Sequence, residues 1–285
     1  MHAPTQAIAV ASRSSPRLLA IETSTDTLSV ALGSGVRGGP LWQHTGPGGA
    51  QASTTLLPLV RDLLDQAGWA LHELDAVVFG RGPGSFTGLR TACAVAQGLA
   101  YGAQTAERPT GVPVLPVDSL LALAEQARLD VLDAGQPLPG VIVALLDARM
   151  NEMYAAPYTC TDQGLRPLLP PRLCAPPDLD AYLAQAVPAT LLGPNSAGLL
   201  AGNVFAVYGE QLAGSAAVRW PTRTALPTAQ ALLSLAPGLL AAGAAVAARD
   251  ALPLYVRDQV AKTTDEREQL RQQALAQAAA DGVRA

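Results

Sequence analysis

The most informative segment of this chain is GRGPGSFTGLR, residues 80–90. It lies between an apolar run, AVVF (residues 76–79), and an alanine-rich run, TACAVAQGLAYG (residues 91–102). Five of its eleven positions are glycine or proline. Glycine reaches backbone angles that a Cβ forbids and lets another backbone or a ligand approach closely. The segment is therefore predicted to be a loop between a strand and a helix, and it is either a tight connector or a cradle for a ligand.

Three strands and a helix are expected before this loop. Alternating and apolar runs bounded by turn-forming residues predict strands at residues 17–24, 28–35 and 40–46. Five large aliphatic residues at helical spacing predict a helix over Ser53–Ala67, with Ser53 as its N-cap. A strand at residues 76–79 and a helix over Thr87–Tyr101 follow, so the order is βββαβα.

The second half of the chain repeats this theme. A strand at residues 112–117 and a helix over Ser119–Leu129 lead into the linker DAGQPLPG, residues 133–140. The segments VIVALLDAR and EMYAAPY then form an apolar strand closed by a carboxylate, a polar turn and another strand. The carboxylates are Glu22 in the first unit and Asp147 in the second. Two such units predict an internally duplicated α/β fold.

The predicted domain organisation has four parts. These are a disordered tail (1–16), an N-terminal lobe (17–117), a C-terminal lobe (118–262) and a C-terminal tail (263–285). A strand at residues 189–193 and helices at residues 178–185 and 228–248 are expected to complete the second lobe. The last helix is able to return to the first lobe.

Composition excludes several classes of protein. The chain has 285 residues, 49% of them apolar, and a formal charge of −4 without a Lys/Arg cluster, so it is a poor candidate for gripping nucleic acid alone. The cysteines, Cys93, Cys160 and Cys174, are odd in number and lack CxxC spacing, which favours a reducing cytoplasm without disulfides. The longest apolar segment, residues 229–248, is interrupted by proline and glycine, so no membrane span is expected.

Two segments are candidates for phosphate or metal chemistry. The hairpin at Glu22, Thr23 and Ser24 could hold a hydrated cation and a phosphate, but turn-stabilising hydrogen bonds are the more common use of such residues. The glycine loop lacks the Lys of a Walker A motif, although a strand, glycines and a helix start can point N–H groups at an anion. The histidines, His2, His44 and His72, form no HExxH array, so no metal site is expected.

Four segments together resemble the TsaB (YeaZ) family. They are LLAIETSTDTLSVAL (18–32), GRGPGSFTGLRTACAVAQGLAYG (80–102), LLDARMNEMYAAPY (145–158) and PLYVRDQVAK (253–262). The resemblance extends from Leu18 to Lys262. It implies an actin-like, sugar-kinase-like (ASKHA) fold of two duplicated βββαβα lobes.

The resemblance also implies a function. A TsaB-like chain is a non-catalytic subunit that binds TsaD, and the two support formation of threonylcarbamoyladenosine next to the anticodon of tRNAs. The ATPase TsaE joins the assembly, and tRNA is reached through the complex. ATP and a metal are used by the partners, and this chain alone is expected to bind no cofactor.

This chain departs from the family pattern at two places. Many relatives have Asp where this chain has Glu22, and the longer side chain weakens the case for nucleotide chemistry. Many also have His shortly before the LLP of the first long helix, where this chain reads Ala52-Ser53-Thr54-Thr55. That change removes a potential metal ligand.

Three groups of residues are therefore assigned. We expect the glycine loop to set the angle of the following helix, with a vestigial anion-facing surface formed with the two hairpins. We expect the first two long helices to present an apolar surface to TsaD, or to a second copy of this chain when TsaD is absent. The glycine-loop residues are Gly80, Gly82, Gly84, Ser85, Thr87 and Gly88; the hairpin residues are Glu22, Thr23, Ser24 and Asp147; the interface residues are Leu56, Leu57, Val60, Leu63, Leu64, Ala92 and Ala96.

The alternative function is an ATP-dependent small-molecule kinase or ATPase of the same fold. Such an enzyme needs an adenosine-binding glycine pair in the second lobe, and this chain offers only the separated Gly193 and Gly198. A glycopeptidase is a third possibility, but the metal ligands that it needs are missing.

Overall fold

The computed structural model describes residues 15–188, 198–213 and 220–257. The chain divides into two units, Met1–Leu254 and Tyr255–Ala285. Only residues 255–257 of the second unit are described, so the fold is that of the first unit.

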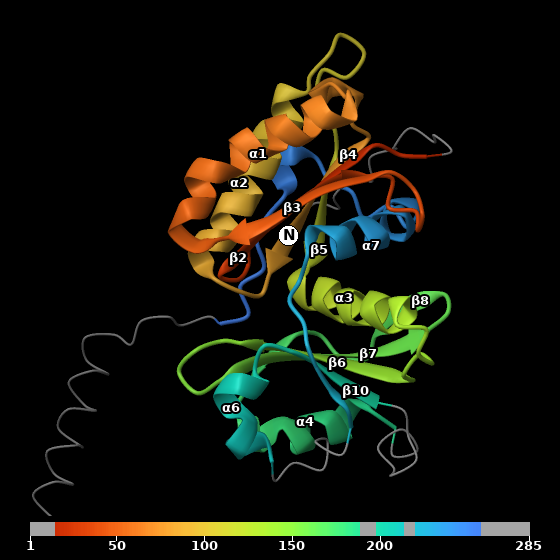
Figure 1. Ribbon diagram of the computed structural model, residues 1–285. Helices are drawn as coiled ribbons and strands as arrows, with labels where there is room; N and C mark the ends of the chain where they lie inside the picture. The colour runs from red at the N-terminus through yellow and green to blue at the C-terminus, as the bar shows by residue number, and fades with distance from the viewer. Residues whose placement is uncertain (1–14, 189–197, 214–219, 258–285) are drawn as a thin grey trace, which may run out of the picture. The chain divides into compact units, whose positions relative to one another are not determined.

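The first unit contains two mixed sheets (Figure 1). In the first sheet β2 is antiparallel to β1 and β3, and β4 is parallel to β1 and β5. Its order is β3-β2-β1-β4-β5, with β1 (Leu18–Glu22), β2 (Thr27–Gly33), β3 (Leu41–Pro47), β4 (Ala76–Gly82) and β5 (Val114–Asp118). Its helices are α1 (Ala52–Ala67) and α2 (Phe86–Gly102).

The second sheet repeats this plan. Its order is β11-β10-β6-β7-β8, and β9 also pairs with β7. The strands are β6 (Val141–Asp147), β7 (Met153–Thr161), β8 (Gly164–Pro167), β9 (Arg172–Cys174), β10 (Gly198–Gly202) and β11 (Thr222–Thr224). The helices α4 (Leu179–Ala186) and α6 (Phe205–Leu212) pack on it, and α3 (Ser119–Asp133) and α7 (Ala229–Ala241) complete the fold.

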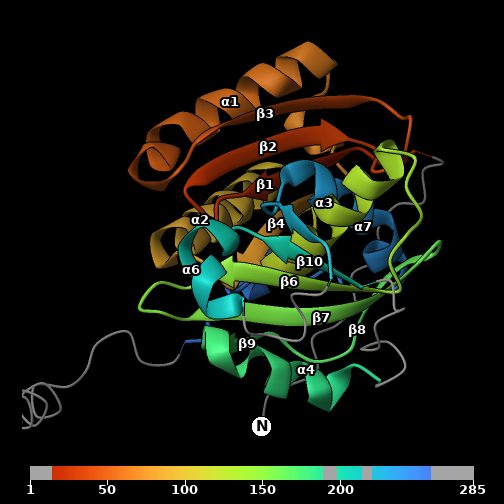
Figure 2. The same cartoon turned by 60° about the horizontal axis from the view of Figure 1, so that its bottom comes forward.

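The layers follow from strands that are buried on both faces. In β1, Leu19 and Ile21 join the core under α1 and α2, whereas Leu18 and Ala20 pack with α7. Side chains alternate across a strand, so a continuously apolar strand must be covered on both sides. Figures 1 and 2 show α3 and α7 between the two sheets, with α1 and α2 on the outer face of the first sheet and α4 and α6 on the outer face of the second. Helix α7 therefore returns to the first sheet.

The duplicated α/β architecture is confirmed. The sequence did not predict β8, β9, β10, α6 or β11, and several helix ends differ from expectation. Helix α1 begins at Ala52, directly after the 3-10 turn Gly49–Gln51, so the prediction that Ser53 is its N-cap is wrong. Helix α7 ends at Ala241 instead of residue 248, because Gly243 takes a left-handed φ of 74° just beyond its end. Helix α3 extends to Asp133. The predicted strand at 189–193, nearly all of the N-terminal tail and the whole C-terminal tail lie outside the described residues.

Candidate functional site

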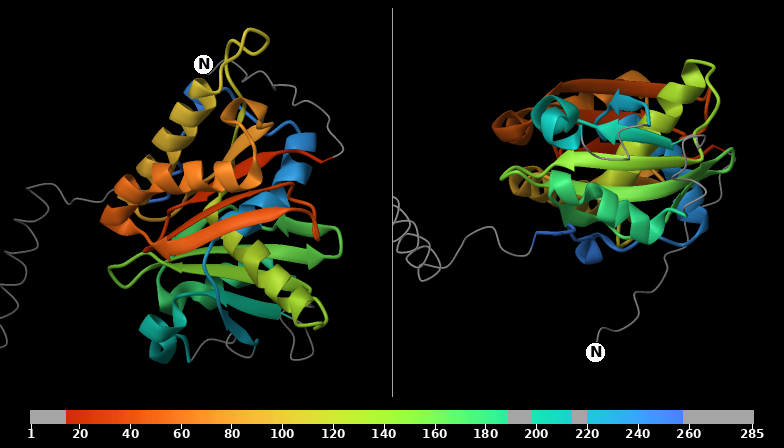
Figure 3. Two further views of the ribbon diagram at one scale, coloured as in Figure 1. Left: turned by 45° about the horizontal axis from the view of Figure 1, so that its top comes forward. Right: turned by 90° about the horizontal axis from the view of Figure 1, so that it is seen from below.

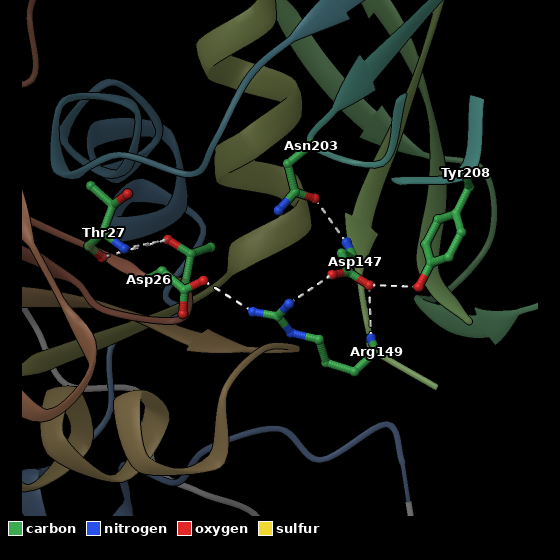
Figure 4. A network of polar contacts seen from close by, with 7 residues as sticks. Asp26, Thr27, Asp147, Arg149, Asn203 and Tyr208 are labelled. Atoms are coloured by element: carbon green, nitrogen blue, oxygen red, sulfur yellow. Dashed lines mark hydrogen bonds and ion pairs between the residues drawn. The ribbon is translucent and has the colours of Figure 1, made fainter. Parts of the chain in front are cut away.

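Two hairpin turns occupy equivalent places in the two sheets. The β1–β2 turn follows Glu22, and the β6–β7 turn follows Asp147. Figure 4 shows Asp26 of the first turn and Asp147 of the second on either side of the Arg149 guanidinium. The structure thus brings the two predicted hairpins near one another through an arginine that sequence reasoning did not single out.

The Glu22 side chain is buried where three elements meet. Its Oε1 accepts a hydrogen bond from the Ser24 backbone N–H (2.6 Å), and its Oε2 accepts one from the Ser119 hydroxyl at the start of α3 (3.0 Å). Burial raises the pKa of the Glu22 carboxyl, and hydrogen bonds from Ser24 and Ser119 oppose that effect. Gly80 passes so close to Glu22 Oε2 that a side chain at this position would collide with the carboxylate. Both carboxylate oxygens are therefore occupied by the chain itself.

The glycine loop packs directly on the β1–β2 turn. The Thr23 hydroxyl donates to the Gly88 carbonyl (2.8 Å), and the Ser85 N–H donates to the Ser24 carbonyl (2.7 Å). A Cβ at Gly84 would collide with Ser24, and one at Gly88 would collide with the Thr23 carbonyl. These contacts favour a tight connector over a cradle, because the glycines are needed for close backbone approach.

The ends of the loop have their own roles. Gly82 has a φ of 116°, a conformation that other residues rarely adopt. Thr87 is exposed in the first turn of α2, where its carbonyl accepts the Thr91 hydroxyl (2.9 Å). The loop is thus fixed at Gly82 by conformation and at Gly84 and Gly88 by packing.

The second hairpin also uses its polar groups internally. Asp147 Oδ1 accepts hydrogen bonds from the Arg149 N–H (2.8 Å) and from the Tyr208 hydroxyl (2.7 Å). Its own N–H donates to Asn203 Oδ1 (2.8 Å). The Asp147 side chain is consequently only 8% exposed.

A phosphate or a cation bound at these hairpins would need free N–H groups and free carboxylate oxygens. The Ser24 N–H is bound by Glu22, and the Thr27 N–H donates to the Thr25 hydroxyl (3.1 Å). In the second lobe Gly198 packs on Trp220, and Gly202 lies against the Leu145 carbonyl; Gly193 lies outside the described residues. At these positions the groups that a phosphate would need are engaged by the chain itself.

The described ranges contain two of the three histidines and omit His2. No cluster of three or more His, Cys, Asp or Glu side chains is placed there to hold a metal ion. His44 lies exposed on β3, and His72 lies exposed in a 3-10 turn. The three cysteines are buried and unpaired with one another.

The predicted interface residues divide into two groups. Leu57 is 51% exposed, and Leu64 is half-buried against the core. The other five lie inside the chain's own core, where each is at most 4% exposed: Leu56, Val60, Leu63, Ala92 and Ala96. These five are therefore not available to a partner, because the apolar arc of α1 and the inner face of α2 cover the first sheet. Some aliphatic residues of α1 were expected to remain exposed, and Leu57 is such a residue.

The outer face of α2 carries small residues, as the sequence predicts. Ala94 and Gly98 are exposed there, one turn apart. Among the described residues, no atom outside the adjacent residues and the helix's own backbone lies within 4 Å of the position that a Gly98 Cβ would take. Nothing in the sequence, by contrast, marked Asn203 or Tyr208 as partners of Asp147.

A shallow groove of about 280 Å³ lies between β3 and the first half of α1. The residues that line it include His44, Thr54, Thr55, Pro58 and Leu59.

The described part of the chain contains no helix with the length and apolar character of a membrane span.

Comparison with known proteins agrees with the fold. Residues 47–264 match the family described as TsaD: tRNA N6-adenosine threonylcarbamoyltransferase. The chain is 30% identical to the tRNA threonylcarbamoyladenosine biosynthesis protein TsaB of Escherichia coli over 86% of this chain and 96% of that protein. It is 41% identical to TsaB of Haemophilus influenzae over 48% of this chain, but this match spans only 51% of the relative.

A solved structure is similar to this chain over most of its length. YeaZ from Pseudomonas aeruginosa is 36% identical, and the match covers 84% of this chain and 99% of that chain with a TM-score of 0.66. The fold is therefore of the actin-like, sugar-kinase-like (ASKHA) type with two duplicated lobes. The chain belongs to the TsaB (YeaZ) family, whose named members act in the biosynthesis of tRNA threonylcarbamoyladenosine.

Proposed function

We propose that this chain is a non-catalytic subunit that binds TsaD and thereby supports formation of threonylcarbamoyladenosine next to the anticodon of tRNAs. TsaE joins the assembly, tRNA is reached through the complex, and the cytoplasm is the compartment. ATP and a metal are used by the partners, and this chain binds neither alone.

The outer face of α1 and α2 carries the proposal. The two helices lie side by side on the first sheet, as Figure 3 also shows in its left view. Leu57 on α1 is a large aliphatic side chain that is 51% exposed. Gly98 on α2 lies in open space, although a glycine inside a helix costs about 1 kcal/mol relative to alanine. The packing of the described residues does not explain this glycine, whereas a helix of a partner that approaches α2 closely would explain it.

The hairpins support the non-catalytic part of the proposal. Glu22 and Asp147 are both held by hydrogen bonds within the chain, and the glycine loop is filled by the Thr23-Ser24 backbone. A catalytic carboxylate must instead reach a substrate or a cation. Catalysis is therefore assigned to the partner.

The test compares two charge substitutions at exposed aliphatic residues. Leu57→Glu places a carboxylate in the proposed interface, and Val207→Glu, at a residue that is 57% exposed on α6, is the matched control. We expect Leu57→Glu to abolish binding of the cognate TsaD in calorimetry and to abolish tRNA modification in a reconstituted reaction. Val207→Glu should retain both, and circular dichroism should show both variants folded.

A second pair of variants examines α2. Gly98→Leu should prevent close approach of a partner helix, whereas Gly98→Ala adds only a methyl group and should weaken binding far less. Without TsaD the same face is able to pair with a second copy, so Leu57→Glu should also reduce any self-association seen by analytical ultracentrifugation. Normal TsaD binding by both Leu57→Glu and Gly98→Leu, or ATP hydrolysis by the isolated parent chain, would refute the proposal.

A further inference from the structure

One guanidinium lies between carboxylates of the two lobes. Arg149 Nη2 is 3.0 Å from Asp26 Oδ2 in the β1–β2 turn, and Nη1 is 3.5 Å from Asp147 Oδ2 at the end of β6 (Figure 4). Arg149 itself belongs to the β6–β7 turn. The contact therefore links segments that are more than a hundred residues apart in the chain.

The turn that carries Arg149 has an unfavourable backbone. Arg149, Met150 and Asn151 have φ angles of 63°, 56° and 61°. A Cβ disfavours this left-handed region, so three such residues in succession need support from elsewhere. Part of that support is local, because the Ala148 N–H donates to the Glu152 carbonyl (2.9 Å) and the Gln211 side-chain amide donates to Asn151 Oδ1 (2.9 Å).

The two carboxylates that Arg149 joins are held differently. Asp147 is 8% exposed and is fixed by the Tyr208 hydroxyl, so it is a rigid anchor within the second lobe. Asp26 is 87% exposed on the first lobe. The Arg149–Asp26 ion pair is therefore the contact that is expected to break first.

We propose that Arg149 is a built-in cation that joins the two hairpin turns and holds the β6–β7 turn in its left-handed conformation. It stands between two carboxylates, where a bound cation would otherwise be needed to keep them together. This inference concerns the chain alone and does not depend on the proposed binding of TsaD.

The link is reversible because it is exposed to water. With side-chain exposures of 72% for Arg149 and 87% for Asp26, the ion pair favours the joined state by less than about fivefold. Salt screens such a pair. The population of the joined state is therefore expected to fall as ionic strength rises, while the buried helices between the sheets keep the fold intact.

Hydrogen exchange of the turn amides, residues 148–152, tests the proposal in the full chain. We expect Arg149→Gln and Asp26→Asn each to accelerate this exchange by up to about fivefold. The double variant should exchange no faster than Arg149→Gln, because Asp26 has already lost its partner in that variant. Asp26→Asn alone leaves the contact of Arg149 with Asp147 in place. Added sodium chloride should accelerate the parent but leave Arg149→Gln unchanged. Arg166→Gln, at an exposed residue of β8, is the control for loss of one positive charge.

Three results would overturn the proposal. The first is equal turn exchange in Arg149→Gln and Arg166→Gln. The second is an additive effect in the double variant, and the third is the same salt response in the parent and in Arg149→Gln. Asp26→Asn also shows whether faster exchange reflects a general loss of stability. A substitution at this exposed turn position should leave the global free energy of unfolding nearly unchanged.

Discussion

Two glycines of α2 show how one residue type serves different purposes. Gly88 lies against the Thr23 carbonyl, whereas Gly98 has open space where its Cβ would be. Only the first is needed for the fold of the isolated chain. The glycine loop and the outer face of α2 are therefore separate features, although they belong to one helix and its N-terminal connection.

The first prediction compares alanine at these two positions. Gly98→Ala should stabilise the isolated chain by up to about 1 kcal/mol, because alanine is the better helix former. Gly88→Ala should destabilise it by about 1–3 kcal/mol, because the methyl group overpacks the contact with the β1–β2 turn. Urea denaturation measures both free energies of unfolding. Equal shifts of the same sign would contradict the packing described for Gly88.

The second prediction concerns pH and Glu22. Burial raises the folded-state pKa of this carboxyl above its ordinary value of 4.5. The stability that Glu22 contributes is therefore fully present below about pH 4.5 and is lost as pH rises through the folded-state pKa. Glu22→Gln does not titrate, so the parent should lose stability relative to this variant as pH rises from about 4 to about 8.

Thermal unfolding of both proteins at intervals across this range checks the prediction. Parallel dependence of the two melting temperatures on pH would show that Glu22 does not titrate differently in the folded chain. Glu22→Asp is a useful second variant, because the shorter side chain cannot keep its contacts with both Ser24 and Ser119. It should be less stable than the parent at every pH.

At the scale of elements, α7 is fixed at its first turn to two other parts of the fold. Its N-cap, Thr228, accepts a hydrogen bond from the Ala231 N–H (3.1 Å) and donates one to Gln126 of α3 (2.5 Å). The Ala229 N–H donates to the Ser29 hydroxyl of β2 (3.0 Å). The helix start thus joins α3 to the first sheet.

Loss of this cap is the third prediction. Thr228→Ala should destabilise the chain by about 1–2 kcal/mol, because it removes both hydrogen bonds of the hydroxyl. Thr228→Ser keeps the hydroxyl and should cost much less. Chemical denaturation with circular dichroism separates the two variants. A Thr228→Ser variant as unstable as Thr228→Ala would mean that the methyl group, not the cap, is important.

At the scale of the whole molecule, the two lobes share a buried centre. Helix α3 contacts strands of both sheets. Glu125 on α3 is 1% exposed, and it accepts hydrogen bonds from Ser234 of α7 (2.6 Å) and from Arg128 (2.7 Å). If one lobe unfolded alone, α3 and the buried Glu125 would be exposed to water.

The fourth prediction is therefore that the lobes unfold together. Trp42 and Trp69 pack against the core of the first lobe, and Trp220 lies in that of the second. In a Trp220→Phe variant, tryptophan fluorescence reports the first lobe and circular dichroism reports both. Their unfolding midpoints should coincide, as in a two-state transition. Separate midpoints would show that the lobes are independent.

The sequence predicted the elements of the first lobe well, those of the second lobe incompletely, and the exposure of single residues poorly. The apolar runs of β1 and β6 and the helical spacing in α1 depend on local pattern, which a sequence contains. The interface prediction failed for Val60 and Ala92, because periodicity identifies an apolar face without showing how wide a surface its own sheet covers. Contacts such as Tyr208 with Asp147 join distant segments, and no local pattern specifies them.

The return of α7 to the first sheet has a consequence for synthesis on the ribosome. Leu18, Ala20, Ala31 and Val78 pack with α7 residues such as Leu232, which are translated about 200 residues after β1. At a synthesis rate of about 5–20 residues per second, one face of the first sheet remains without α7 for roughly 10–40 seconds. During that time the nascent chain displays an apolar sheet face, which makes it a natural client for chaperones that act at the ribosomal exit.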